Sequence, residues 1–115
     1  MSMSCGEATI GLLAQYGIDT VFGIPGVHTL DFCSGLGEGS SIQHIQVRNE
    51  QGAGFMAEGY ARATGKPAVA LVISGPGVTN AATAIGQSWA DSLPCLLYTS
   101  PSPRDLSTSR MPSSA

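Results

Sequence analysis

The stretch RNEQGAGFMAEGYARATGKP, residues 48–67, organises the rest of the chain. Its apolar and small side chains recur at the 3.6-residue spacing of a helix: Ala53, Phe55, Met56, Tyr60 and Ala61. Asn49 is a suitable N-cap, and Gly65 followed by Pro67 is a typical stop signal, because glycine adopts the left-handed C-cap and proline cannot continue a helix. The stretch therefore predicts a helix of about four turns, with Glu50 in its first turn.

Glu50 lies where a predicted strand is followed by this helix. Residues 42–47, IQHIQV, alternate well enough to form a strand, so the Glu50 carboxylate is expected at the carboxyl edge of a sheet, where α/β proteins bind ligands. A structural explanation competes, since the helix dipole favours acidic residues in the first turn. Position alone favours the structural explanation, and the choice depends on the neighbouring motifs.

The composition excludes several classes of protein. With 115 residues, the chain is long enough for one domain with a modest core. A net charge of -3 and 11% charged residues leave no basic face for nucleic acid. No apolar run approaches the ~20 residues that span a bilayer, and no secretory signal opens the chain. We therefore expect no nucleic-acid or membrane partner, and a cytoplasmic location, or an organelle if the source is eukaryotic.

The three cysteines, Cys5, Cys33 and Cys95, are odd in number and far apart in sequence. This spacing matches neither a disulfide framework nor a CxxC metal site, so reduced thiols are expected. No metal ligand is predicted in this chain.

Strands and helices alternate along the chain. A capping box formed by Ser4 and Glu7 opens the first helix, which ends at Gly17. The further predicted elements are a strand at 19–23, a short helix at 28–36, the strand at 42–47, the long helix, a buried strand at 68–73, a helix at 78–90 and a strand at 95–97. This alternation predicts an α/β fold: an open, mainly parallel sheet with helices on both faces.

The last 18 residues, 98–115, differ from the rest. They are rich in serine, threonine and proline and contain almost nothing to bury, so disorder is expected. They also resemble translated adapter or vector sequence. The predicted division is therefore an incomplete domain at 1–97 and a non-native tail at 98–115, with a much longer natural protein.

Three motifs carry a family resemblance: VFGIPG at 21–26, RNEQGA with MAEGYAR at 48–62, and SGPGVTN at 74–80, followed by DSLP at 91–94. In this order and spacing they resemble the N-terminal pyrimidine-binding domain of thiamine-diphosphate enzymes, in the acetolactate synthase-like and 2-oxo acid decarboxylase family. The resemblance covers about residues 6–97. It implies an enzyme, a lyase or transferase that removes carbon dioxide from a 2-oxo acid with or without carboligation.

The resemblance makes Glu50 the catalytic residue, which binds N1′ of the cofactor aminopyrimidine. A carboxylate there favours protonation of the ring and its 4′-imino tautomer, whose nitrogen can take the thiazolium C2 proton. The carbanion then attacks the 2-oxo acid, and the thiazolium accepts electrons when carbon dioxide leaves. Glutamine cannot replace Glu50 in this role because it cannot share a proton.

The resemblance also implies the other site residues. The cofactor-binding residues are Glu50, Pro25, Gly26, Gly75, Pro76, Gly77 and Asn80. Glycines let the backbone pass close to the pyrimidine, whereas Asn80 is equally well explained as a cap of its own helix.

Val27 and His28 are candidate substrate contacts. The residue after Pro-Gly is acidic in pyruvate-decarboxylase-like relatives and usually glycine in the synthases, so Val27 departs from both. IPGVHT at 24–29 instead resembles decarboxylases of larger 2-oxo acids, such as guanidino-oxopentanoate. A surface or helix-capping role for His28 is the simpler alternative.

A dinucleotide site is the rival interpretation of residues 75–80, since GPGVTN is close to the fingerprint GxGxxG. Asn80 replaces the third glycine, Pro76 removes a backbone donor, and no acidic residue ends a second strand about 20 residues later. A nicotinamide or flavin Rossmann domain is therefore rejected.

The resemblance implies partners outside this chain. The cofactors are thiamine diphosphate and Mg²⁺, the latter bound by a domain absent here, with FAD as a further cofactor of the full-length protein. That missing diphosphate-binding domain belongs to a second subunit of a homodimer or tetramer, and helices exposing Phe55, Met56, Tyr60 and Trp89 are expected at an interface. The chain alone is expected to be inactive. The alternative is a non-catalytic α/β module or an inactive gene-model fragment.

Overall fold

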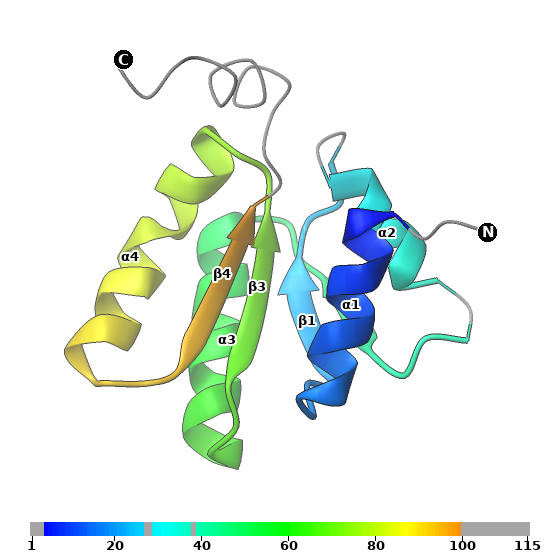
Figure 1. The fold of residues 1–115 in the computed structure, drawn as a ribbon. Coiled ribbons are helices and arrows are strands. Elements are labelled where there is room, and N and C mark those ends of the chain that lie inside the picture. The colour runs from blue at the N-terminus through cyan, green and yellow to red at the C-terminus, as the bar shows by residue number, and fades with distance from the viewer. Residues whose placement is uncertain (1–3, 27–28, 38, 100–115) are drawn as a thin grey trace, which may run out of the picture.

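The structure is a computed structural model that describes residues 4–26, 29–37 and 39–99. A parallel sheet of four strands forms its centre, and Figure 1 shows how the chain is arranged around that sheet. Its strands are β1 (Thr20–Gly23), β2 (Gln43–Gln46), β3 (Ala68–Val72) and β4 (Cys95–Thr99). They lie in the order β2-β1-β3-β4, and every neighbouring pair is parallel. The predicted α/β class is confirmed.

Helices cover both faces of the sheet, as predicted. They are α1 (Cys5–Gln15), α2 (Leu30–Gly35), α3 (Glu50–Thr64) and α4 (Pro76–Ala90). The step from β1 to β2 runs in one direction across the sheet, and the steps to β3 and β4 run in the other. Because such crossovers are right-handed, α2 is placed on one face beside α1, and α3 and α4 on the opposite face (Figure 1).

The core consists of two clusters, one on each side of the sheet. The pleat of β3 sends Val69 and Leu71 to the α1 face and Ala68 and Ala70 to the α3 face. On the α3 face these alanines meet a stripe of small buried side chains: Ala53, Ala57 and Ala61. Because the residues on both surfaces are small, the backbone of the helix can lie close to the backbone of the sheet on this face.

Most predicted helix ends are confirmed. Ser4 and Glu7 form the capping box, and the Asn49 side chain accepts a 2.8 Å hydrogen bond from the backbone of Gln51. Gly65 ends α3 in the left-handed conformation, with a φ of 75°. These features depend on neighbouring residues alone, which explains why the sequence could predict them.

Several boundaries differ from prediction, most of them by one or two residues. Helix α4 starts at Pro76 rather than Val78, because proline suits the first helical position. Helix α2 starts at Leu30, and its predicted start at His28 lies outside the described residues. Strand β4 continues to Thr99, so Tyr98 and Thr99 pair with β3 and belong to the sheet instead of the predicted tail. Residues 100–115 lie outside the described residues, and their origin stays a prediction.

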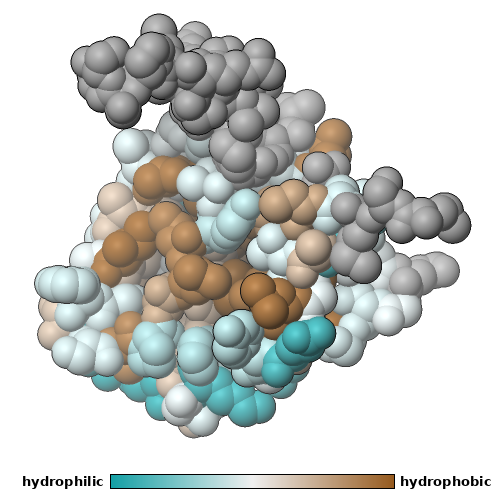
Figure 2. Space-filling model, in the orientation of Figure 1, coloured by the Kyte–Doolittle hydropathy of each residue, from teal (hydrophilic) through white to brown (hydrophobic). Residues whose placement is uncertain are grey.

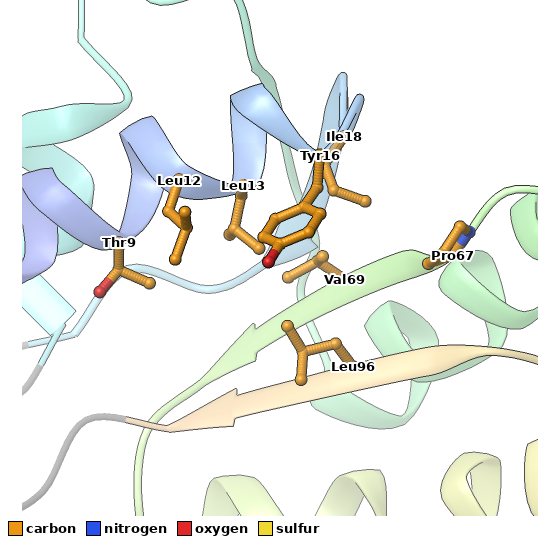
Figure 3. A pocket seen from close by; sticks show the side chains of 8 residues that line it. All are labelled: Thr9, Leu12, Leu13, Tyr16, Ile18, Pro67, Val69 and Leu96. Atoms are coloured by element: carbon orange, nitrogen blue, oxygen red, sulfur yellow. The ribbon is translucent and has the colours of Figure 1, made fainter.

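An apolar groove lies on the α1 face, where α1 leaves β3 and β4 uncovered. It has a volume of about 400 Å³ and is lined by Thr9, Leu12, Leu13, Tyr16, Ile18, Pro67, Val69 and Leu96 (Figure 3). Figure 2 shows the same face, where apolar residues gather in a band across the middle of the molecule. Leu96 of β4 is 45% exposed there. The groove offers almost no polar group to a ligand.

None of the helices in the described ranges 4–26, 29–37 and 39–99 is long and apolar enough to cross a membrane.

Candidate functional site at the carboxyl edge of the sheet

The order of the strands defines a switch point between β1 and β3. From β1 the chain steps outward to β2, and it then crosses back over β1 to form β3. Ligands of open α/β sheets bind in the crevice at the carboxyl ends of strands at such a point. The turns that follow β1, β2 and β3 meet at this edge, and they contain the three sequence motifs.

Glu50 is the acidic residue at this edge. It is the first residue of α3, directly after the Asn49 cap, and its side chain is half-buried. The Asn80 amide Nδ2 donates a 3.1 Å hydrogen bond to Glu50 Oε1 across 30 residues of sequence. Among the described residues Glu50 forms no ion pair. Its negative charge therefore meets one neutral donor and no compensating cation.

The turn after β3 passes beside the Glu50 carboxylate. A Cβ added to Gly77 would lie 2.8 Å from Ile73 Cγ2 and 3.6 Å from Glu50 Oε2, so any side chain there would be crowded against the end of β3 next to the acid. Gly75 has a φ of 77°, which glycine adopts readily. Pro76 then begins α4. Of the two glycines in this turn, Gly77 lies next to the acid, and their role in a close approach to the cofactor stays a prediction.

The Pro25–Gly26 turn after β1 borders the same edge. A Cβ added to Gly26 would lie 3.3 Å from Ile73 Cδ1, which places this turn against the end of β3. Thr29, fully buried, holds the turn: its Oγ1 accepts a 2.9 Å hydrogen bond from the Gly26 amide, and its own amide donates to the Gly26 carbonyl at 2.9 Å. Val27 and His28 lie outside the described residues, so their predicted substrate role stays a prediction.

The structure resolves two questions about individual residues. Asn80 is the fifth residue of α4, whose N-cap is Gly75, so the interpretation of Asn80 as a cap of its own helix is wrong. Sequence reasoning missed Thr29 altogether. Its signal was a threonine three residues after a glycine at the start of a short helix, a common way to close a turn with a hydroxyl.

Metal binding is a separate question at this edge. Within the described part of the chain, no group of three or more His, Cys, Asp or Glu side chains gathers where it could hold a metal ion.

The switch-point turns, the crowded glycines and a carboxylate that forms no ion pair with a described residue are the features of a doubly wound α/β domain, a class that binds ligands at the carboxyl edge of its sheet. Comparison with known families identifies the class more narrowly. The family described as "Thiamine pyrophosphate enzyme, N-terminal TPP binding domain" matches residues 3–113. The chain belongs to this family, as the motifs around Glu50 had suggested.

Individual relatives lie in two groups of enzymes. The chain is 63% identical over 99 residues to the Pseudomonas aeruginosa protein named "Probable 2-ketoarginine decarboxylase AruI", covering 86% of this chain and 18% of that protein. It is 45% identical over 100 residues to the large subunit of acetolactate synthase isozyme 1 from Escherichia coli, covering 87% of this chain and 18% of the relative. The chain thus spans about a fifth of the length of these relatives.

A solved structure confirms the fold. A protein from Mycobacterium smegmatis, assigned as a thiamin diphosphate-dependent enzyme, superimposes with a TM-score of 0.81 at 27% identity. The match covers 96% of this chain and 21% of that one. The parallel sheet and its helices are therefore those of a thiamine-diphosphate enzyme.

Proposed function

We propose that this chain supplies the pyrimidine-activating half of the active site of a thiamine-diphosphate-dependent enzyme that acts on 2-oxo acids. The observation that carries the proposal is the state of Glu50. Its Oε1 is occupied by Asn80, its Oε2 lies beside Gly77, and no described cation neutralises it. Such a carboxylate is suited to share a proton with a basic ring nitrogen.

The residues at the edge fit an aminopyrimidine ring. A flat ring needs a shallow surface without side chains, and Gly26 and Gly77 both lie where a Cβ would crowd Ile73. It also needs one polar group in its plane, and Glu50 is available for that role. Pro25, Gly75 and Pro76, from the turns after β1 and β3 and the start of α4, complete the proposed set of cofactor-binding residues, and Asn80 of α4 joins them through its hydrogen bond to Glu50.

In the proposed mechanism this chain handles a proton. Glu50 holds it between Oε2 and the ring nitrogen, and the first turn of α3 favours the negative charge that remains when the proton is on the ring. Gly77 lets the ring approach that oxygen. Thiamine diphosphate, when bound, supplies the carbanion nucleophile and the electron sink for loss of carbon dioxide from a 2-oxo acid.

The substrate is proposed to be a large 2-oxo acid with a guanidino group, which makes the enzyme a lyase. Two observations support this: the turn IPGVHT at 24–29 and the 63% identity to a relative named for 2-ketoarginine. Carboligation by an acetolactate synthase-like transferase is the second candidate, and the 45% identity to the Escherichia coli synthase subunit supports it. Val27 and His28 are the residues of this chain proposed to contact the substrate.

Further parts of the site are proposed to come from outside this chain. A diphosphate-binding domain of a second subunit would hold Mg²⁺ and the cofactor diphosphate, in a cytoplasmic homodimer or tetramer that binds FAD only if it is synthase-like. The coverage of 18% of the relatives leaves ample length for such a domain. Exposed apolar side chains on α3 and α4, among them Phe55, Met56 and the 86% exposed Trp89, are suited to its interface.

The test uses the longer protein that contains this domain. Glu50→Gln should lower the turnover of 2-ketoarginine by about 100- to 10,000-fold, the usual contribution of acid–base catalysis, while thiamine diphosphate still binds. Glu58→Gln, which changes an acid two turns further along α3, is the matched control and should keep its turnover. Undiminished turnover in Glu50→Gln would contradict the proposal.

A binding measurement separates the alternative of a non-catalytic module. The 115-residue chain should bind thiamine diphosphate and Mg²⁺ weakly or not at all in calorimetry, because half of the site is proposed to lie elsewhere. Tight stoichiometric binding by this chain would refute that division of the site.

A further inference from the structure

We propose that Asn80 is a positioning residue, which acts through Glu50 rather than on the cofactor itself. It fixes the Glu50 carboxylate so that one oxygen alone is left to meet the pyrimidine. This inference rests on the proposed function, and it assigns to Asn80 a different role from the direct cofactor contact that the sequence motif suggested.

The packing of two helices brings the pair together. Helices α3 and α4 lie side by side on one face of the sheet, and Gly54 of α3 faces Ala84 of α4 so closely that a Cβ on Gly54 would lie 2.5 Å from the Ala84 Cβ. Glu50 precedes Gly54 by four residues, and Asn80 precedes Ala84 by four. The Glu50–Asn80 hydrogen bond therefore lies about one helical turn before this close contact between the two helices.

The chemistry of the pair suits its proposed task. An amide donates a hydrogen bond to a carboxylate without neutralising it, whereas lysine or arginine at position 80 would compensate the charge. The bond occupies Glu50 Oε1 and leaves Oε2 beside Gly77. Fixing a glutamate side chain in one rotamer costs conformational entropy. Because the hydrogen bond holds the side chain before the ligand arrives, binding of the ligand does not have to include this loss of entropy.

The exposure of Asn80 distinguishes a positioning role from a role in the stability of the fold. Asn80 is exposed. Among the described residues, the hydrogen-bond partner of its side chain is Glu50. An exposed amide on a helix surface contributes little to folding. Its removal should therefore alter the geometry of Glu50 and leave the fold intact.

The first test needs no cofactor. In the ¹⁵N-labelled 115-residue chain, the side-chain amide resonances of Asn80 should move in Glu50→Ala, because the acceptor is lost. They should stay in place in Glu58→Ala. If the Asn80 resonances are the same in wild type and Glu50→Ala, the contact is absent in solution and the inference is overturned.

The second test uses the longer protein loaded with thiamine diphosphate. Asn80→Asp keeps the shape of the side chain but replaces its donor with an acceptor that repels Glu50. It should lower both the rate at which the cofactor C2 proton exchanges for deuterium and kcat by about 10- to 100-fold, as expected for a displaced catalytic group. The KM for the 2-oxo acid should stay nearly unchanged. Asn80→Ala should show the same effect in smaller size.

Gln87→Ala is the control, since Gln87 is an amide on the same helix that donates to Asp91 at 2.7 Å instead. The outcomes distinguish the two proposals. Unchanged exchange in Glu50→Gln would overturn the proposed function. Slow exchange in Glu50→Gln combined with wild-type exchange in both Asn80 variants would overturn the positioning role alone.

Discussion

The two edges of the sheet are built in different ways. At the amino edge, charged and polar side chains pair with one another: Asp19 accepts a hydrogen bond from the Tyr60 hydroxyl and lies 3.8 Å from Lys66 Nζ. Near the same edge Arg62 of α3 bonds both Glu58 and Asp91. The three ion pairs between described residues all lie on this side. At the carboxyl edge the described residues give Glu50 one neutral hydrogen-bond partner, and the turns after β1 and β3 contain glycine and proline.

This difference puts both the close packing and the available carboxylate at the carboxyl edge. The charged side chains at the amino edge are paired with one another, so their charges are already compensated without a ligand. Small residues at the carboxyl edge let backbones approach one another and leave a carboxylate available. Close packing at the carboxyl edge should then dominate the free energy of unfolding, since exposed ion pairs contribute little.

Gly23→Ala should cause the largest loss in the free energy of unfolding among the substitutions considered for the two edges. Gly23 ends β1 at the carboxyl edge, and an added Cβ would lie 2.0 Å from the backbone carbonyl oxygen of Leu71. Backbone on both strands would have to move, so we expect a loss of about 3 kcal/mol or more in the free energy of unfolding. Urea denaturation measures it. A variant as stable as wild type would mean that β1 and β3 do not pair in this register.

Gly54→Ala tests the contact between α3 and α4. The added methyl group would overlap Ala84, which is buried, and we expect a loss of about 1–3 kcal/mol. Gly59→Ala in the same helix is the matched control. Nothing lies within 4 Å of its added Cβ, so the higher helix propensity of alanine should stabilise by about 0.5–1 kcal/mol. The same sign for both substitutions would contradict the described packing.

Tyr60→Phe should have a small, pH-dependent effect at the amino edge. The Tyr60 hydroxyl lowers the pKa of Asp19, and the Asp19 carboxylate raises the pKa of Tyr60. The lowered pKa adds stability above about pH 4 that is lost as the pH falls further, and the raised one adds stability that is lost above about pH 10. The midpoint of thermal unfolding should therefore fall slightly near neutral pH and by less near pH 3, where the contribution of Asp19 is being lost.

Phenylalanine keeps the ring contact with Phe22, whose centroid lies 5.9 Å away, so the substitution isolates the hydroxyl. An equal loss at both pH values would show that the effect comes from packing rather than from the pair with Asp19.

Glu50→Gln should have the smallest effect on stability. Its amide oxygen can still accept the hydrogen bond from Asn80, and no ion pair among the described residues is lost. We expect a change within about 0.5 kcal/mol in the free energy of unfolding. A large loss would show that Glu50 is a structural residue of the helix start, which is the interpretation that its position alone favoured.

The sequence predicted those parts of the fold that depend on neighbouring residues. The capping box at Ser4, the N-cap at Asn49 and the left-handed Gly65 are all set within one or two helical turns, and all are confirmed. The buried strand 68–73 was recognisable because both faces of a central parallel strand are apolar. The end of β4 was missed, since pairing of Tyr98 and Thr99 with β3 depends on a partner far away in sequence.

The sequence by itself determined the family, the α/β class and the position of Glu50 at a strand-to-helix junction, because motifs and periodicity are local properties. It left open what Asn80 contacts, and the hydroxyl of Thr29, which closes the turn at Gly26, was missed. The hydrogen bond from Asn80 to Glu50 was decided by the tertiary structure, in which the packing of α3 against α4 joins residues 30 positions apart. A hydrogen bond between distant segments depends on how whole helices pack, and no local pattern encodes that distance.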